Sequence, residues 1–307
     1  MTTKFTRRQF IELSSKMTVL MGLSTNAIPD IAQALENLAT GRVKVLWLQA
    51  QSCSGCSISL LDSEHPNPAE LLTQYMSLLF HHTISAASGD RCMDIVEKTS
   101  KAGGHILVVE GSIPAGMPEA CMMGHKPMTE LVSEAAKTAS HVIAIGTCAA
   151  FGGIPGAEGN PTGAISVATF LKQQKISTTV INIPGCPTHP DWFVGSLTYL
   201  AKYGLPPLDK HSRPLMFFKR TIHENCPRFY DYERENFAKS FSEEGCLFKI
   251  GCLGVITYAD CTIRDRNGGT NNCIKAGAPC VGCSSEIFAL KKSFLFYRKN
   301  ESKYLGE

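Results

Sequence analysis

Hydrophobic and polar residues follow a repeating block pattern between residues 43 and 205. Short runs rich in β-branched residues predict strands, and the longer amphipathic stretches between them predict helices. We expect strands at residues 43–48, 105–109, 141–145 and 178–183. We expect helices at residues 128–139, 164–174 and 190–202. This alternation is typical of a doubly wound α/β fold, in which helices cover both faces of a parallel sheet.

The pattern changes after about residue 205, where Pro206, Pro207 and Pro214 mark a boundary. The remaining residues, 206–307, show little regular periodicity but hold seven of the thirteen cysteines. We therefore predict a second, loop-rich domain over 206–307, following a first domain over 43–205. Such a region lacks a large apolar core, so inorganic crosslinks are the natural way to hold it together.

Residues 1–34 have the order of an export signal. Lys4, Arg7 and Arg8 precede a mostly apolar stretch at 17–23, and a small-residue Ala-Gln-Ala site follows at 32–34. Paired arginines indicate a twin-arginine signal peptide, so we expect a periplasmic protein. The alternative is an amphipathic N-terminal helix with an accidental arginine pair. No later stretch offers 18 consecutive apolar residues, so we expect any membrane association to come through a partner.

Composition narrows the classes of function. The chain has 307 residues, of which 44% are hydrophobic and 19% charged, and its formal net charge is +3. These values are typical of an ordinary soluble globular protein and argue against disorder. The basic excess is small and scattered, so we expect no nucleic-acid partner.

Four cysteines follow predicted strands. Cys53 and Cys56 come after the first strand, Cys148 after the third and Cys186 after the fourth. Because the carboxyl ends of parallel strands meet at one edge of a sheet, we expect these thiols to converge. A redox dithiol would need no further thiols, whereas an iron-sulfur cubane needs four. A zinc ion would also accept four thiolates.

The second region supplies eight more candidate ligands, which bring the total to twelve, or three sets of four. They are His223, Cys226, Cys246, Cys252, Cys261, Cys273, Cys280 and Cys283. A disulfide framework fits less well, because thirteen is odd and the C-x-x-C pairs would form strained bridges. Cys92 and Cys121 remain, and we expect both to be packed or bystander thiols.

These motifs resemble the electron-transferring small subunit of nickel-iron hydrogenases over nearly the whole chain. The resemblance rests on the twin-arginine leader and on Cys53-Ser54-Gly55-Cys56, Val109-Glu110-Gly111, Gly146-Thr147-Cys148, Gly152-Gly153, Pro184-Gly185-Cys186-Pro187, His223-Glu224-Asn225-Cys226-Pro227, Gly251-Cys252, Cys261 and Pro279-Cys280-Val281-Gly282-Cys283. It implies a flavodoxin-like first domain followed by an iron-sulfur domain.

The resemblance also implies which residues hold which cluster. The proximal set, Cys53, Cys56, Cys148 and Cys186, would hold a 4Fe-4S cluster. The distal set, His223, Cys226, Cys246 and Cys252, would hold a second 4Fe-4S cluster near the surface. The medial set, Cys261, Cys273, Cys280 and Cys283, would lie between them.

Cys273 bears on whether the medial cluster has three irons or four. The family's usual medial centre is a 3Fe-4S cluster with three cysteines, and a proline stands where this chain has Cys273. We therefore predict a medial 4Fe-4S cluster, as in the nickel-iron-selenium branch, which the chain also resembles at Ser57-Ile58-Ser59. If Cys273 points away, the centre stays a 3Fe-4S cluster. Gly55 and Gly153 stand where oxygen-tolerant relatives carry extra cysteines, so we expect an ordinary proximal cubane.

The implied function is that of one subunit of a two-subunit enzyme, and we expect no catalytic acid or base in this chain. The chain would belong to an uptake hydrogenase of the nickel-iron or nickel-iron-selenium type. It would relay electrons away from a large subunit that holds the nickel-iron centre. The acceptor would be a periplasmic cytochrome c or a membrane-anchored electron-transfer subunit. Alternatives are a stand-alone multi-cluster ferredoxin-like carrier, a complex I-like subunit and an exported protein with disulfides or zinc.

Overall fold

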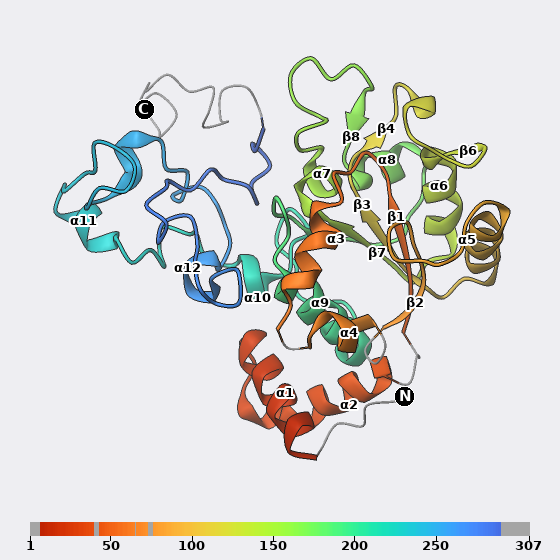
Figure 1. The fold of residues 1–307 in the computed structure, drawn as a ribbon, viewed down its shortest axis with the longest axis horizontal. Helices are drawn as coiled ribbons and strands as arrows, with labels where there is room; N and C mark the ends of the chain where they lie inside the picture. The colour runs from red at the N-terminus through yellow and green to blue at the C-terminus, as the bar shows by residue number, and fades with distance from the viewer. Residues whose placement is uncertain (1–6, 40–42, 65, 73–75, 290–307) are drawn as a thin grey trace.

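A computed structural model describes residues 7–39, 43–64, 66–72 and 76–289. Its centre is a five-stranded sheet with strand order β2-β1-β3-β7-β9 (Figure 1), and all neighbouring strands are parallel. The strands are β1 (Lys44–Gln49), β2 (Ser77–His81), β3 (Ile106–Glu110), β7 (His141–Ile145) and β9 (Val180–Ile183). In sequence order this is the 2-1-3-4-5 arrangement of flavodoxin-like folds. The predicted fold class is confirmed.

Helices cover both faces of this sheet, because successive strand residues point to opposite sides. Leu46 and Leu48 of β1 belong to one buried cluster, whereas Val45 and Trp47 belong to the other. The first cluster includes side chains of α5 (Asp90–Ala102), α6 (Met128–Thr138) and α8 (Val167–Gln173). The second includes those of α9 (Pro190–Tyr203) (Figure 1).

Most predicted strands and helices differ from the observed ones by one to three residues at an end, and α5 and β2 are not among the expected elements. Strand β2 is not among the expected strands, because only three of its five residues are apolar and so short a run carries little periodicity. Helix α8 begins at Val167 rather than at residue 164, since Ala164 and Ile165 form β8 and pair with β4 (Ile113–Pro114). The hydroxyl of Ser166 then accepts a hydrogen bond from the Thr169 N–H and caps α8.

Short elements complete the first domain. Two of them follow strands at the carboxyl edge of the sheet: α3 (Gly55–Ser59) and α7 (Gly146–Phe151). The others are β5 (Met122–Met123), β6 (Lys126–Pro127), α4 (Pro68–Glu70), η2 (Leu60–Asp62) and η4 (Pro118–Ala120). A further short helix, η1 (Thr25–Ala27), belongs to the N-terminal segment.

The N-terminal segment forms two helices, α1 (Arg7–Leu20) and α2 (Ile28–Ala39), below the sheet domain in Figure 1. Met17 and Ile31 are buried in the cluster that includes α9, and Asp30 pairs with Lys202 of α9 at 3.3 Å. Lys4 of the predicted export signal lies outside the described residues. Within the described part of the chain, none of the helices combines the length and hydrophobicity needed to cross a bilayer.

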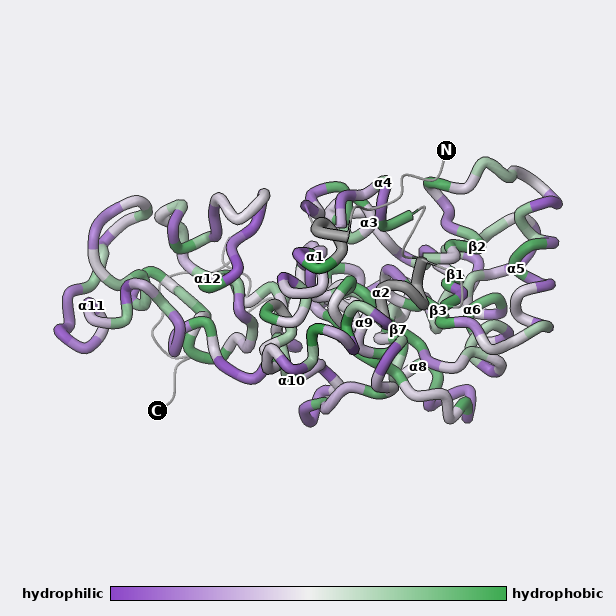
Figure 2. Tube along the Cα trace, turned by 90° about the horizontal axis from the view of Figure 1, so that it is seen from below, coloured by the Kyte–Doolittle hydropathy of each residue, from purple (hydrophilic) through white to green (hydrophobic). Residues whose placement is uncertain are grey.

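The region after α9 contains short helices joined by loops and forms one end of the elongated molecule (Figure 2). These helices are α10 (Leu215–Phe218), α11 (Phe229–Glu233), η5 (Leu247–Ile250) and α12 (Cys261–Arg264). Trp192 of α9 joins the two regions. Its indole N–H donates to Asp260 at 2.7 Å, and its ring lies 4.9 Å from that of Phe218. Residues 290–307 of the predicted second domain lie outside the described residues.

Candidate metal centres

The proximal set gathers at the carboxyl edge of the sheet, as the sequence predicted from strand order. Cys53 follows β1, Cys56 lies in α3, Cys148 lies in α7 after β7, and Cys186 follows β9. Burial raises the pKa of Cys148, and the nearby Cys53 raises it further. Burial raises the pKa of Cys186 to about 12, with a further contribution from Cys148. The four thiols are therefore close enough to interact electrostatically.

Glu110 organises the loop that carries the first two thiols. It ends β3 beside β1, which is the topological switch point where flavodoxin-like folds bind ligands. Its carboxylate is 2% exposed. It accepts hydrogen bonds from the Cys56 N–H at 3.1 Å, the Ser52 hydroxyl at 2.9 Å and the Trp47 indole at 3.1 Å. The buried Glu110 thus fixes the path of the chain around Cys56.

Two glycines allow the backbone to approach these thiols closely. A Cβ atom on Gly146 would lie 2.5 Å from Sγ of Cys56, and one on Gly153 would lie 2.8 Å from Sγ of Cys148. Both glycines have positive φ, at +84° and +54°. The site therefore needs glycine at these positions, both for conformation and for space.

The distal set lines one pocket of the second region. His223, Cys226, Cys246 and Cys252 all contribute to its walls. Burial raises the pKa of Cys226 to about 11. Main-chain N–H groups of Arg228 and Gly254 donate to the sulfurs of Cys226 and Cys252, each at 3.4 Å. Burial lowers the pKa of His223, which favours the neutral imidazole that can act as a ligand.

The medial set also gathers, and Cys273 is part of it. Burial raises the pKa of Cys273, and the nearby Cys283 raises it further. Desolvation raises the pKa of the partly buried Cys261, and Cys283 and Cys273 raise it further. Cys280 is partly buried and interacts electrostatically with both Cys283 and Cys261. Cys273 is exposed, and it interacts electrostatically with Cys283 and Cys261.

The three sets form one continuous series. Cys186 of the proximal set interacts electrostatically with Cys283 of the medial set. At the other side of the medial set, the Cys280 N–H donates to Sγ of Cys252 in the distal set at 3.4 Å. The order along the molecule is therefore proximal, medial, distal.

The donor chemistry fits iron-sulfur clusters. All thirteen cysteines are free thiols, and burial together with neighbouring thiols raises the pKa values within each set. Bound iron would reverse this preference, because a coordinated thiol is deprotonated by the metal charge. Among the described residues, no three His, Cys, Asp or Glu side chains are placed to hold a single ion. A cubane differs from a single ion because each thiolate binds a separate iron.

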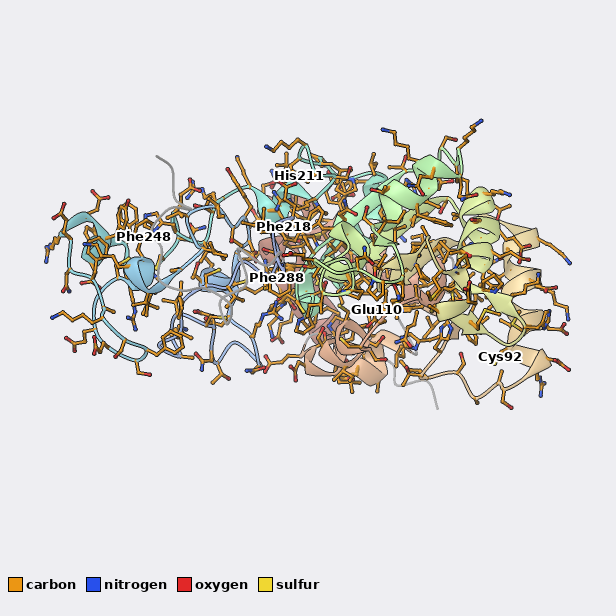
Figure 3. The ribbon with its side chains drawn as sticks, turned by 90° about the horizontal axis from the view of Figure 1, so that it is seen from above. Cys92, Glu110, His211, Phe218, Phe248 and Phe288 are labelled. Atoms are coloured by element: carbon orange, nitrogen blue, oxygen red, sulfur yellow. The ribbon has the colours of Figure 1, made fainter. Side chains whose placement is uncertain are left out.

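Cys92 and Cys121 do not join the three sets. Cys92 donates its S–H to the carbonyl of Ala87 at 2.9 Å, and Figure 3 shows it at the opposite end of the molecule from Phe248. Burial raises the pKa of Cys121, for which no thiol partner contributes. Both behave as packed thiols, as expected.

Sequence reasoning missed polar residues around the proximal set. Ser57 donates a short hydrogen bond to Glu110 and lies 3.0 Å from Nε2 of His81. Thr147 bonds to Cys283 of the medial set. Glu110 carried a detectable signal, a charged residue at the end of an otherwise apolar strand, but the partners of Ser57, His81 and Thr147 are distant in sequence.

Comparisons with known proteins show which family the chain belongs to. A family model described as NADH ubiquinone oxidoreductase, 20 Kd subunit, matches residues 53–200. A second, which describes the C-terminal part of the NiFe/NiFeSe hydrogenase small subunit, matches residues 218–296. The periplasmic NiFeSe hydrogenase small subunit of Desulfomicrobium baculatum is 40% identical over 309 residues, covering 94% of this chain and 97% of that protein. The chain belongs to the NiFe/NiFeSe hydrogenase small-subunit family.

Other members of the hydrogenase small-subunit family support the same conclusion. The uptake hydrogenase small subunit of Azotobacter vinelandii is 35% identical over 298 residues, covering 94% of this chain and 82% of that protein. A solved structure of NiFeSe hydrogenase from Desulfovibrio vulgaris Hildenborough in the oxidised state matches with a TM-score of 0.77 and 40% identity. It covers 80% of this chain and 94% of that chain. The resemblance inferred from the motifs is confirmed.

Proposed function

We propose that this small subunit relays electrons through three iron-sulfur clusters during hydrogen oxidation. One observation carries the proposal: the proximal, medial and distal sets follow one another without a gap along the molecule. Contacts between Cys186 and Cys283, and between Cys252 and Cys280, connect successive sets. The alternative, a stand-alone multi-cluster ferredoxin-like carrier, differs from this proposal in having no catalytic partner.

The assignment of ligands follows the three sets. The proximal set would hold a 4Fe-4S cluster, the distal set a second one, and the medial set, with Cys273 as fourth ligand, a third. When bound, these clusters supply one-electron transfer with little movement of atoms. The chain's own residues hold the thiols at fixed positions, and Glu110 orients the Cys53–Cys56 loop. N–H groups that donate to Cys226 and Cys252 favour electron arrival at the distal set.

The surface beside the proximal set suits a protein partner. Ile58, Leu61 and Ile154 are 59%, 61% and 54% exposed, and Cys53 is exposed beside them. Ile154 also hydrogen-bonds through its backbone to the Cys148 thiol. Exposed apolar groups around a buried redox site favour a permanent interface. We infer that a hydrogenase large subunit with a nickel-iron or nickel-iron-selenium centre docks here, so that electrons enter at the proximal set.

Export, domains and direction complete the proposal. Residues 1–34 would form a twin-arginine signal, 43–205 the flavodoxin-like domain and 206–307 the iron-sulfur domain. The two family matches fall on either side of the boundary between the latter domains.

Relatives named periplasmic and uptake favour a periplasmic enzyme that oxidises hydrogen. Its acceptor would be a cytochrome c or a membrane-anchored subunit.

Metal and sulfide analysis of the purified two-chain complex tests this proposal. Three cubanes require about twelve irons and twelve sulfides in the small subunit, and nickel should co-purify with the partner. Reduction under hydrogen should bleach the brown cluster absorbance. A preparation that contains clusters but no nickel-bearing chain would favour the ferredoxin-like carrier, and one without iron would exclude both.

A further inference from the structure

We propose that Thr147 is a positioning residue that couples the proximal set to the medial set through its hydroxyl group. This inference rests on the proposed function, because it concerns electron transfer between two of the proposed clusters. Thr147 is 1% exposed. It lies at the start of α7, directly before Cys148 of the proximal set.

The hydroxyl of Thr147 connects three loops. It donates a short hydrogen bond to the carbonyl oxygen of Cys283, which belongs to the medial set. It accepts a hydrogen bond from the N–H of Gly185 at 2.9 Å. Gly185 directly precedes Cys186 of the proximal set. One hydroxyl thus uses its donor and an acceptor lone pair at the same time.

Two bonded routes between the sets pass through this group. From Cys148, the route runs through one peptide link to Thr147 and then across the hydroxyl hydrogen bond to Cys283. From Cys186, it runs through Gly185 and across two hydrogen bonds to the same carbonyl. Hydrogen-bonded chains of this kind also fix the separation of the groups they connect.

The main chain of Thr147 has a separate task. Its N–H donates to the carbonyl of Gly185 at 3.0 Å, which ties the loop after β7 to the loop after β9. A substitution that keeps the backbone therefore keeps Cys148 and Cys186 in register. Loss of the hydroxyl removes the link to Cys283 and leaves the Gly185 N–H without this partner. The defect should appear between the proximal and medial sets rather than within the proximal set.

The link from the medial to the distal set is built differently. There, the main-chain N–H of Cys280 donates to Sγ of Cys252, so no substitution at Cys280 other than proline removes the donor. Thr147 consequently offers a way to weaken one junction of the relay while the next stays unchanged.

The test compares Thr147→Val, Thr147→Ser and Thr198→Val in the two-chain complex. Valine keeps the branched shape and removes the hydroxyl, whereas serine keeps the hydroxyl. Thr198 is the matched control, because it is 0% exposed and its hydroxyl donates to Val194 within α9 at 2.8 Å. The measurements are iron content, the magnetic interaction between the reduced proximal and medial clusters, and the delay between their reduction after rapid mixing with hydrogen.

We expect Thr147→Val to keep its iron, to lose magnetic interaction and to lengthen the delay severalfold. Thr147→Ser and Thr198→Val should match the wild type. Wild-type coupling and delay in an iron-replete Thr147→Val complex would overturn the inference. The Thr147→Val complex could instead lose the medial cluster. In that case, a Thr147→Ser complex that keeps the medial cluster and its magnetic coupling supports the role of the hydroxyl. Loss of the medial cluster in both variants overturns the inference. Failure of the proposed function would appear already in the wild type, as missing clusters.

Discussion

The main-chain N–H of Cys280 donates a hydrogen bond to Sγ of Cys252, with 3.4 Å between nitrogen and sulfur. These residues belong to the medial and distal sets, so a backbone atom of one proposed ligand touches the sulfur of another. A second N–H, from Gly254, reaches the same sulfur at 3.4 Å. Donors to a ligand sulfur stabilise the reduced cluster. The junction therefore joins two sets, and in the proposed relay it would favour electron arrival at the distal side.

Gly146→Ala should remove the proximal cluster. The added Cβ would lie 2.5 Å from Sγ of Cys56, a separation that forces the thiol to move. We expect iron content to fall by about four per complex. Gly104→Ala is the matched control, since Gly104 has a similar φ of +70° but a Cβ added there would meet no atom within 4 Å. Both carry left-handed strain of about 1–2 kcal/mol, so equal iron loss in the two variants would contradict the contact argument.

Cys273→Ala should convert the medial cluster from four irons to three. The thiol of Cys273 interacts with Cys283 and Cys261, and its removal deletes one ligand. We expect a loss of about one iron per complex and a new paramagnetic resonance signal of an oxidised 3Fe-4S centre. Cys92→Ser, remote from the three sets, should leave the spectrum unchanged. A strong 3Fe-4S signal in the unaltered protein would defeat the four-iron assignment.

His223→Ala should slow electron exit more than hydrogen splitting. The imidazole ring is held by ring contacts to Tyr232 at 4.6 Å and Phe229 at 5.2 Å. As a neutral ligand it would raise the potential of the distal cluster relative to a fourth thiolate. Reduction of an external acceptor should therefore fall, whereas hydrogen–deuterium exchange at the large subunit should persist. The exposed His125→Ala serves as the control, and equal loss of both activities would argue against an exit role.

Acidification should destabilise the sheet domain through His81. Burial lowers the pKa of His81 to about 4, whereas an unfolded histidine titrates near about 6.5. The unfolded state therefore binds the proton more tightly than the folded state. As a result, the free energy of unfolding is highest above pH 6.5 and falls as pH drops toward 4. The loss is at most about 3 kcal/mol.

The measurement is the thermal midpoint of the complex at pH 7 and pH 5. His81→Gln keeps a polar group beside Ser57 but does not titrate, so its midpoint should fall less than that of the wild type. Parallel falls in both proteins would assign the acid sensitivity to other groups, such as the half-buried His82, whose pKa burial also lowers.

The sequence predicted most of the sheet, because buried parallel strands are continuous apolar runs. The run at 141–145 matches β7, and the run at 43–48 differs from β1 by one residue at each end. The short edge strand β2 was not predicted, since its three apolar residues do not distinguish a strand from a helix. Convergence of the proximal thiols was also predictable, because parallel strands end at a common edge.

By itself, the sequence determined the fold class, the family and the number of soft ligands, since these depend on local periodicity and on residue type at fixed spacing. The tertiary structure decided which thiols meet and in what order the sets follow one another. The tertiary structure also decided that Glu110 and Thr147 hold the loops that carry these thiols. Those contacts join residues as far apart as Thr147 and Cys283. No local pattern encodes them, because loop closure and packing bring such residues together only when the whole chain folds.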